Sequence, residues 1–245
     1  MFRFGNPEYL EIAQKNIEFV KQNLWSEDGN LYRTYKNKTA KINGFLEDYA
    51  FAIDALIGLY EVTSDEKYLF DAKQLTDYVL DNFYDSEKGL FRFKSVQDVS
   101  LVSENYEIED NVIDSSNSVM AQNLYVLSVY FSLSHYEDIC RKMLRIVVSN
   151  IDYPSAFSNW LNVLLNFDSS QKELAICGKN AFECLKIINQ NYFPDLTVSA
   201  TENSSNLPFL KDRFTKGVLH FFVCRNKVCG LPLQHFDEVL NQIKR

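Results

Sequence analysis

The sequence has little glycine, proline and histidine, and each scarcity excludes a class of protein. Eight glycines and five prolines in 245 residues exclude collagen-like and low-complexity chains. Glycine never occurs as Gly-x-Gly and no Walker A motif is present, so neither common nucleotide-binding fingerprint is available. Three histidines leave few places for a histidine-dependent catalytic triad.

Runs of lysine and arginine are also missing. The chain has 33 acidic and 25 basic residues, a net charge of −8, so the electrostatic footprint of a nucleic-acid-binding protein is absent and no nucleic-acid partner is expected. No uninterrupted apolar stretch approaches about 18 residues, and residues 1–6 (MFRFGN) contain no apolar core of a secretion signal. We therefore expect a cytoplasmic protein that neither spans a membrane nor is secreted.

Cysteine is sparse, and its number, five, is odd. This favours reduced thiols in a cytosol over a disulfide framework. Cys224 and Cys229 lie close to His220 and His235, but zinc sites usually pair their ligands at tighter spacing. Ordinary thiols are the favoured interpretation, ahead of zinc and ahead of a disulfide. No metal and no cofactor is expected.

The sequence does contain many aromatic residues, 14% of the chain, and strong helical periodicity. Asn6 followed by Pro7 is a typical helix start. After it, apolar residues follow at spacings of three and four, which predicts one amphipathic helix: Leu10, Ala13, Ile17, Val20 and Leu24. Similar patterns predict helices near residues 46–60, 69–83, 120–131 and 157–164, and a further helix opened by a capping box from Ser134 to Glu137.

The last third has a different pattern. Short apolar runs near residues 174–178, 196–200 and 219–223 predict strands, with helices near 180–190 and 236–244. We therefore predict a single domain, with helical hairpins in residues 1–168 and a mixed α/β cap in residues 169–245.

A weak internal repeat connects the predicted hairpins. Tyr9-Leu10-x-x-Ala13 recurs as Tyr68-Leu69-x-x-Ala72, and the tripeptide at 31–33 (LYR) recurs at 90–92 (LFR), each about 59 residues later. The helices are joined alternately by short and long connections, the long ones near 25–43 and 84–114. In a ring of hairpins the long connections would collect on one face, and loops of that length are usually functional or disordered.

Several motifs resemble the YyaL-type proteins, which include the spermatogenesis-associated thioredoxin-like proteins of animals. The most specific is GFLEDYAF at 44–51, followed by LYEVT at 59–63. Further matches are DSSNS at 114–118, ICG at 176–178, and Val223-Cys224 with Cys229 and Pro232.

That resemblance implies an α/α toroid similar to six-hairpin glycosidases and N-acylglucosamine 2-epimerases. In the family a thioredoxin-like domain precedes the toroid. Here that domain and the Trp-Asn motif that opens the toroid are absent, so we expect a mainly α fold, an incomplete toroid nearer four helical pairs than six, with a small β element.

The candidate catalytic residues are Asp48 and Glu47 at the start of an inner helix, with Tyr49 beside them. Carboxylates there could act as general acid or base on a sugar. Adjacent helical residues point about 100° apart, so at most one can face a given atom, and Asp48 is preferred. The alternative is that both carboxylates complement the helix N-terminus and bond a neighbouring backbone.

Three further residues are candidate substrate-binding groups. Asn117 begins the next inner helix and could reach the same cavity as Asp48, but a helix cap is the favoured interpretation. Arg33 and Arg92 occupy equivalent repeat positions, where they could hold a carboxylate or phosphate or instead pair with local acids.

Two functions follow as hypotheses. The first is binding of a sugar or other small hydroxylated molecule at the toroid mouth, with epimerase- or glycosidase-like activity if the protein is an enzyme. The second is a non-catalytic scaffold that packs against a separate thioredoxin-like protein or against itself. An exposed apolar stripe at Ile12, Ile17 and Val20 would favour the scaffold.

Overall fold

The computed structural model describes residues 6–99, 104–167 and 171–244. Six helices form the N-terminal part, and Asn6 caps the first of them by accepting a hydrogen bond from the backbone N of Glu8 at 3.0 Å, as its sequence predicts. The helices are α1 (Pro7–Asn23), α2 (Leu46–Thr63), α3 (Glu66–Phe83), α4 (Ser116–Phe131), α5 (Ser134–Val148) and α6 (Ser158–Leu165), the last preceded by the 3-10 turn η2 (Pro154–Phe157).

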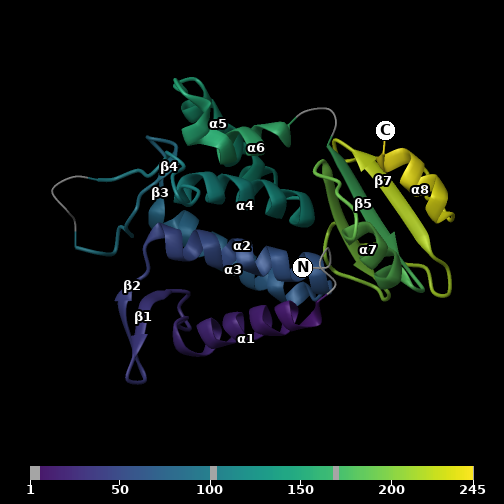
Figure 1. The fold of residues 1–245 in the computed structure, drawn as a ribbon, viewed down its shortest axis with the longest axis horizontal. Helices are drawn as coiled ribbons and strands as arrows, with labels where there is room; N and C mark the ends of the chain where they lie inside the picture. Colours follow the sequence, from purple (N-terminus) through teal and green to yellow (C-terminus); the bar gives the residue numbers. More distant parts are fainter. Residues whose placement is uncertain (1–5, 100–103, 168–170, 245) are drawn as a thin grey trace.

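These helices lie in two layers, with α4 packed between α2 and α6 and with α3 and α5 covering them (Figure 1). The core between the layers is aromatic: Tyr49, Tyr60, Tyr130, Tyr136 and Phe83 are almost completely buried. The chain is therefore mainly α, as predicted. Within the described residues α2 with α3 and α4 with α5 form two closely packed pairs, α1 packs against α2, and α6 packs against α4 and α5. The toroid arrangement stays a prediction.

Two short hairpins close the same end of the helical layers. They are β1 (Tyr32–Lys36) with β2 (Thr39–Asn43), and β3 (Tyr84–Asp85) with β4 (Leu90–Phe91), both antiparallel. Figure 1 shows both hairpins at the end remote from the larger sheet. The prediction that the long connections collect on one face is confirmed.

The C-terminal third forms a four-stranded sheet in the order β6-β5-β7-β8. Its elements are β5 (Lys172–Cys177), α7 (Ala181–Asn189), β6 (Leu196–Thr201), β7 (His220–Arg225), β8 (Val228–Cys229) and α8 (Phe236–Ile243). Strand β5 pairs with β6 in parallel and with β7 antiparallel. The three strands and two helices predicted here are present.

The alternation of β5 side chains explains how the sheet joins the helices. Leu174 and Ile176 pack in a cluster with α7 and α8, whereas Ala175 and Cys177 belong to the core of the helical layers. The sheet therefore lies between α7 and α8 on one face and the helical layers on the other. The predicted division between residues 168 and 169 falls outside the described residues, as do residues 1–5, and the single-domain assignment stays a prediction.

Buried hydroxyl groups fasten the sheet to the helices. The Tyr60 hydroxyl shares a hydrogen bond with Ser199 Oγ on β6, and the Tyr130 hydroxyl donates to the carbonyl oxygen of Val198 at 3.1 Å. The backbone N of Phe209 donates to the carbonyl oxygen of Tyr130 at 3.1 Å. These contacts connect α2 and α4 to strands that are distant in sequence.

One local prediction is wrong. Helix α5 starts at Ser134, but its N-cap is Leu133 and no capping box forms. Glu137 instead forms ion pairs with Arg141, one turn along α5, and with Lys227 of the sheet. A distant cation therefore replaces the local backbone bond that the sequence suggested. No helix in the described residues is long and apolar enough to cross a membrane.

Candidate functional site

A groove of about 430 Å³ runs between α1 and α2, and we call it the α1–α2 groove. Its walls are mainly apolar, because both helices contribute aliphatic side chains and Phe51 lies on the α2 side. Tyr32, Arg33 and Asp48 also line it. The groove therefore offers an apolar surface with a charged pair from β1 and α2.

Arg33 joins the two acidic candidates. Its Nη1 lies 2.6 Å from Glu47 Oε1 and 2.9 Å from Asp48 Oδ2, and all three side chains are partly exposed. The hydrogen bond that Arg33 donates to Glu47 is the largest cause that raises the pKa of Arg33, with Asp48 adding to it, so the guanidinium stays charged. The Arg33 guanidinium also lies 4.9 Å from the centre of the Phe45 ring.

Asp48 has a second, structural role at the start of α2. Its Oδ2 accepts a hydrogen bond from the backbone N of Phe45 at 2.8 Å, which is the helix-start role given as the alternative. Within the described residues no donor is bonded to Oδ1 of Asp48, so this oxygen is free to accept from a ligand. Glu47 does not line the groove and acts on it through Arg33.

Tyr49 points into the protein and away from the groove. Its side chain is fully buried, its hydroxyl donates to Asn30 Oδ1 at 3.0 Å, and it accepts from the backbone N of Leu31 at 2.8 Å. Burial raises the pKa of Tyr49 well above its ordinary value, so the hydroxyl keeps its proton. Tyr49 therefore fixes the chain that leads into β1.

Asn117 is likewise fully buried and bonded to backbone. Its Oδ1 accepts from the backbone N of Phe91 at 2.8 Å, and its Nδ2 donates to the carbonyl oxygen of Phe91 at 2.9 Å. Ser115, two residues earlier, is the N-cap of α4. Both polar atoms of Asn117 are thus occupied by β4, and in this structure the side chain offers nothing to a ligand.

Arg92 pairs with local acids, as the alternative for it expected. Its Nη2 bonds Asp85 Oδ2 at 2.5 Å and its Nε bonds Glu104 Oε1 at 3.0 Å. The Tyr106 hydroxyl donates to both of these carboxylates. Hydrogen bonding to Tyr106 is the largest cause that lowers the pKa of Asp85. Arg92 is therefore part of a closed ionic network beside β3 and β4.

The two copies of the repeat share one arrangement. In each, a buried side chain from the first turn of an inner helix, Tyr49 or Asn117, bonds the backbone of the aromatic–basic segment that precedes it. The arginine that follows in each segment is paired with carboxylates. The structure thus brings Arg33, Glu47 and Asp48 together in the first copy of the repeat. Asn117 and Arg92 belong to the second copy and do not join them.

Asp110 is a polar centre that the sequence analysis missed. The side chain is buried, and it accepts from the backbone N of Ser115 at 2.9 Å, from Ser118 Oγ at 2.8 Å and from the backbone N of Asn159 at 2.8 Å. One carboxylate therefore serves the N-termini of both α4 and α6. The nearby serines were a local signal, but the contact to Asn159 is 49 residues distant.

The thiol prediction for Cys224 and Cys229 is wrong, because the two residues form a disulfide across β7 and β8. Cys140 and Cys177 are buried free thiols, and Cys184 is half-buried. In the part of the chain that is described, no group of three or more His, Cys, Asp or Glu side chains is placed to hold a metal ion. The pairing removes the cysteine argument for a reducing compartment, and cytoplasmic location stays a prediction.

Comparison with curated proteins finds relatives along nearly the whole chain. Human spermatogenesis-associated protein 20 is 26% identical over an alignment of 251 residues that covers 94% of this chain and 32% of that protein. The mouse protein of the same name is 25% identical over 251 residues, with the same coverage. The chain thus spans about a third of the length of the curated relatives it matches. These relatives support the family resemblance found in the motifs.

Two further comparisons add little. No family model matches the chain. Among solved structures, the Lin0763 protein from Listeria innocua matches 63% of this chain and 41% of its own, with 17% identity and a TM-score of 0.44. A likeness at that level carries no argument about arrangement or function.

Proposed function

We propose that the α1–α2 groove binds a small hydroxylated molecule of the sugar type. The observation that carries this proposal is the paired Arg33 and Asp48 on the wall of a groove that is otherwise mainly apolar. A sugar ring presents hydroxyl groups at its rim and C–H groups on its faces. Asp48 Oδ1 would accept from a hydroxyl, and Phe51 would pack against a C–H face.

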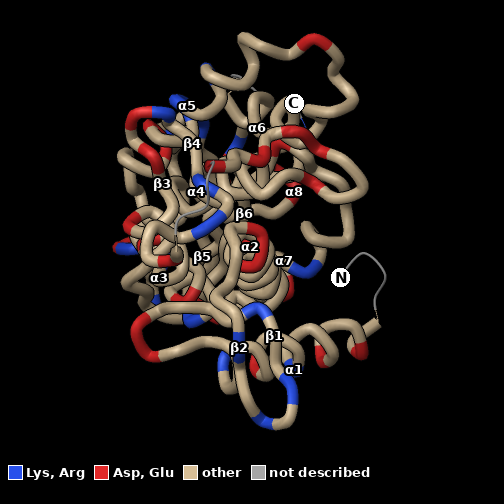
Figure 2. Tube along the Cα trace, turned by 90° about the vertical axis from the view of Figure 1, so that its left-hand side faces the viewer, with Lys and Arg blue, Asp and Glu red and all other residues tan. Residues whose placement is uncertain are grey.

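The surroundings also suit a ligand that carries negative charge. The β1–β2 hairpin contains Arg33, Lys36, Lys38 and Lys41 and no acidic residue, and Figure 2 shows this basic group beside α1. Sugar phosphates therefore belong among the candidate ligands, because a local positive field attracts anions even in an acidic protein.

The helical layers are, on this proposal, part of an α/α toroid. Inner helices α2 and α4 each begin beside a hairpin, at the end where both hairpins gather. Should the protein turn its ligand over, Asp48 is the group we expect to act as general acid or base, with Glu47 holding Arg33 in place. Epimerase- or glycosidase-like chemistry would follow from that role.

The test is a thermal-shift screen of monosaccharides, amino sugars and sugar phosphates against the parent and Asp48→Asn. A ligand at 100 times its dissociation constant stabilises the fold by about 2.7 kcal/mol, which raises Tm by roughly 5 to 10 °C for a chain this size. Asp138→Asn is the matched control, since Asp138 is an exposed carboxylate on α5, away from the groove. A shift that the control keeps and Asp48→Asn loses supports the proposal.

Two results would count against it. One is the absence of any shift across the panel, and the other is a shift that Asp48→Asn leaves unchanged. For a ligand that passes this test, turnover is measured by proton NMR of the anomeric signals, which distinguishes epimerisation from hydrolysis. Loss of turnover with retained binding in Asp48→Asn would assign it a chemical role.

The scaffold function remains the second candidate, and one observation favours it. Tyr9, Ile12 and Phe19 on α1 are 49%, 61% and 46% exposed, an apolar face of the kind that packs against another protein. The predicted stripe forms only in part, because Ile17 is buried and Val20 lines the groove. Sedimentation velocity of the parent and of Ile12→Glu tests the scaffold function. Self-association of the parent that Ile12→Glu abolishes would support it. A parent that is monomeric at every concentration would argue against self-association.

A further inference from the structure

Cys224 and Cys229 form a disulfide in which one cysteine is buried and the other is exposed. Cys224 on β7 is 1% exposed, whereas Cys229 on β8 is exposed. The two residues are direct partners across the hairpin, which turns through Asn226 and Lys227. Both turn residues have positive φ, 50° and 64°, as a two-residue hairpin turn requires. An attacking thiol can therefore approach Cys229 from solvent.

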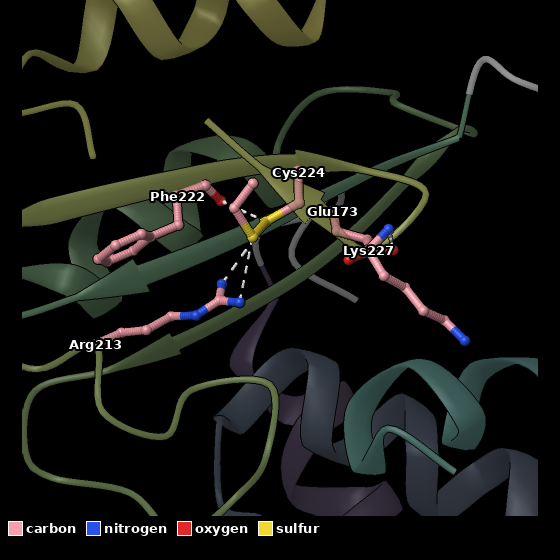
Figure 3. The surroundings of a disulfide bond; sticks show 6 residues. Glu173, Arg213, Phe222, Cys224 and Lys227 are labelled. Atoms are coloured by element: carbon pink, nitrogen blue, oxygen red, sulfur yellow. Dashed lines mark hydrogen bonds between the residues drawn. A yellow bond between two sulfur atoms is a disulfide. The ribbon is translucent and has the colours of Figure 1, made fainter. Parts of the chain in front are cut away.

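Arg213 points its guanidinium at this disulfide. Nη1 lies 3.8 Å from Cys224 Sγ and Nη2 lies 3.4 Å from Cys229 Sγ. Figure 3 shows the guanidinium directed at the disulfide. The guanidinium also lies 5.7 Å from the ring centre of Phe209 and 5.2 Å from that of Phe222. The two rings hold the cation in position beside the sulfur atoms.

This arrangement leaves a half-buried cation without an anion. Among the described residues, no carboxylate lies within 4 Å of the Arg213 guanidinium, in contrast to Arg33, Arg92 and Arg141. Burial is the largest influence on Arg213 and lowers its pKa, while charge interactions with Cys177 and Glu173 oppose this shift only in part. A disulfide carries no charge and accepts hydrogen bonds weakly, so it is a poor partner for a guanidinium. A thiolate at either sulfur would be a strong one.

We propose that Cys224–Cys229 is a reversible redox site that exchanges with a dithiol, and that Arg213 stabilises the thiolate formed when the bond opens. In the first step a thiolate of the dithiol attacks Cys229 Sγ and forms a mixed disulfide. The bond between Cys224 and Cys229 breaks, and its electron pair goes to Cys224 Sγ beside Nη1 of Arg213. In the second step the other thiol of the reagent, after losing its proton, attacks its own sulfur in the mixed disulfide and releases the Cys229 thiolate beside Nη2.

Electrons and protons balance in this exchange. The dithiol loses two electrons and two protons and becomes a cyclic disulfide, and the two cysteines gain the two electrons. The protons pass to the released sulfurs or to solvent.

Contacts outside the disulfide keep the hairpin in place after reduction. Lys227 pairs with Glu137 on α5, and its backbone N donates to Glu173 Oε1 at 3.3 Å. The backbone N of Gly230 donates to the carbonyl oxygen of Val223 at 3.1 Å. Because these bonds do not involve sulfur, the reduced cysteines stay beside Arg213, and the cation can act on them.

The test equilibrates the folded protein in buffers of reduced and oxidised dithiothreitol, traps thiols with iodoacetamide and measures them by peptide mass spectrometry. Trypsin cuts after Arg225 and after Lys227, so Cys224 and Cys229 fall on separate peptides and the disulfide is seen as their covalent pair. The variants are Arg213→Gln, which removes the charge, and Arg213→Lys, which keeps it. Lys211→Gln is the control, because Lys211 is an exposed cation two residues from Arg213.

In buffers alkaline enough for the reduced cysteines to be thiolates, we expect Arg213→Gln to need about a fivefold to tenfold higher ratio of reduced to oxidised reagent for half reduction, because loss of one pKa unit at a thiol is then a factor of about ten in the stability of the reduced state. Arg213→Lys should lie between it and the parent, and Lys211→Gln should match the parent. In the reduced parent, iodoacetamide should modify Cys229 faster than in Arg213→Gln at pH 7. These differences should vanish in 6 M guanidinium, where the fold no longer places the cation.

The proposal is overturned if Arg213→Gln and the parent have the same midpoint, or if the difference persists in guanidinium. It is also overturned if the native protein shows no linked peptide pair after non-reducing digestion. Circular dichroism of each variant separates these outcomes from unfolding, and Arg213→Lys provides the comparison should Arg213→Gln not fold.

Discussion

Replacing Asn117 with alanine distinguishes a structural from a ligand-binding side chain. The two bonds from Asn117 to the Phe91 backbone, at 2.8 and 2.9 Å, join two residues that are both 0% exposed. Alanine would leave a buried N–H and a buried C=O at Phe91 without these partners. Each such group costs roughly 1 to 3 kcal/mol, so we expect a loss of about 3 kcal/mol in the free energy of unfolding.

The assay is urea unfolding followed by the fluorescence of Trp25 and Trp160, together with thermal unfolding. A loss of this size lowers Tm by about 6 to 12 °C in a chain of this length. Asn150→Ala is the matched control, since Asn150 is exposed at the end of α5 and bonds the carbonyl oxygen of Ile146 at 2.6 Å. It should change stability by about 0.5 kcal/mol or less. If Asn117→Ala were as stable as this control, the bridging role assigned to Asn117 would be refuted.

Two further substitutions test the sheet and the inner helix. Gly178→Ala should lower the free energy of unfolding by about 3 kcal/mol or more, because φ is +122° and an added Cβ would lie 1.8 Å from the carbonyl oxygen of Val218. Gly58→Ala is the control and should be neutral or stabilising, because nothing lies within 4 Å of the added Cβ. Equal Tm values for the two variants would contradict this reasoning. Although Glu61 keeps contact with solvent, the protein atoms around its carboxylate desolvate it and raise its pKa to about 7 from 4.5, and repulsion from Asp54 adds to the shift. The folded state therefore holds its proton more tightly, and stability falls as the pH rises from about 4.5 to 7. Glu61→Gln should remove this loss, so the variant should be about 1 kcal/mol more stable than the parent at pH 7.5 and equally stable at pH 4. The gain is small because Glu61 is solvent-exposed. An unchanged pH dependence of Tm would argue against the pKa shift.

Much of the secondary structure was predictable because its signals are local. The Asn6-Pro7 start, the apolar spacing of α1 and the apolar run of β5 each depend on neighbouring residues, and each is found in the structure. The alternation of short and long connections also predicted that the long ones collect on one face, and Figure 1 shows both hairpins at one end. Local propensity and the tertiary fold agree at these positions.

The roles of individual polar residues were harder to predict, since they depend on contacts far along the chain. Asn117 is a plausible cap by sequence, but its partner Phe91 is 26 residues away. The sequence pattern also gave no preference for pairing Cys224 with Cys229. That bond depends on a turn at Asn226 and Lys227, and the sequence there lacks the Asn-Gly or Asp-Gly pair that marks such turns.

The α1–α2 groove could not be predicted from the sequence either. Periodicity identified Ala13, Ile17 and Val20 as one apolar stripe, but it could not show how closely α1 packs against α2. All three line the groove, but Ile17 is buried whereas Ala13 and Val20 are half-buried. The packing of two whole helices decides this difference, and no short motif encodes it.

The bond between Tyr60 and Ser199 has a consequence for synthesis of the chain on the ribosome. The two residues are 139 positions apart. At roughly 5 to 20 residues per second, α2 emerges about 7 to 28 seconds before its partner strand. During that interval the face of α2 and α4 that will receive the sheet has no cover from its own chain. A growing chain of this protein is therefore a candidate for chaperone binding at that face until β6 has been made.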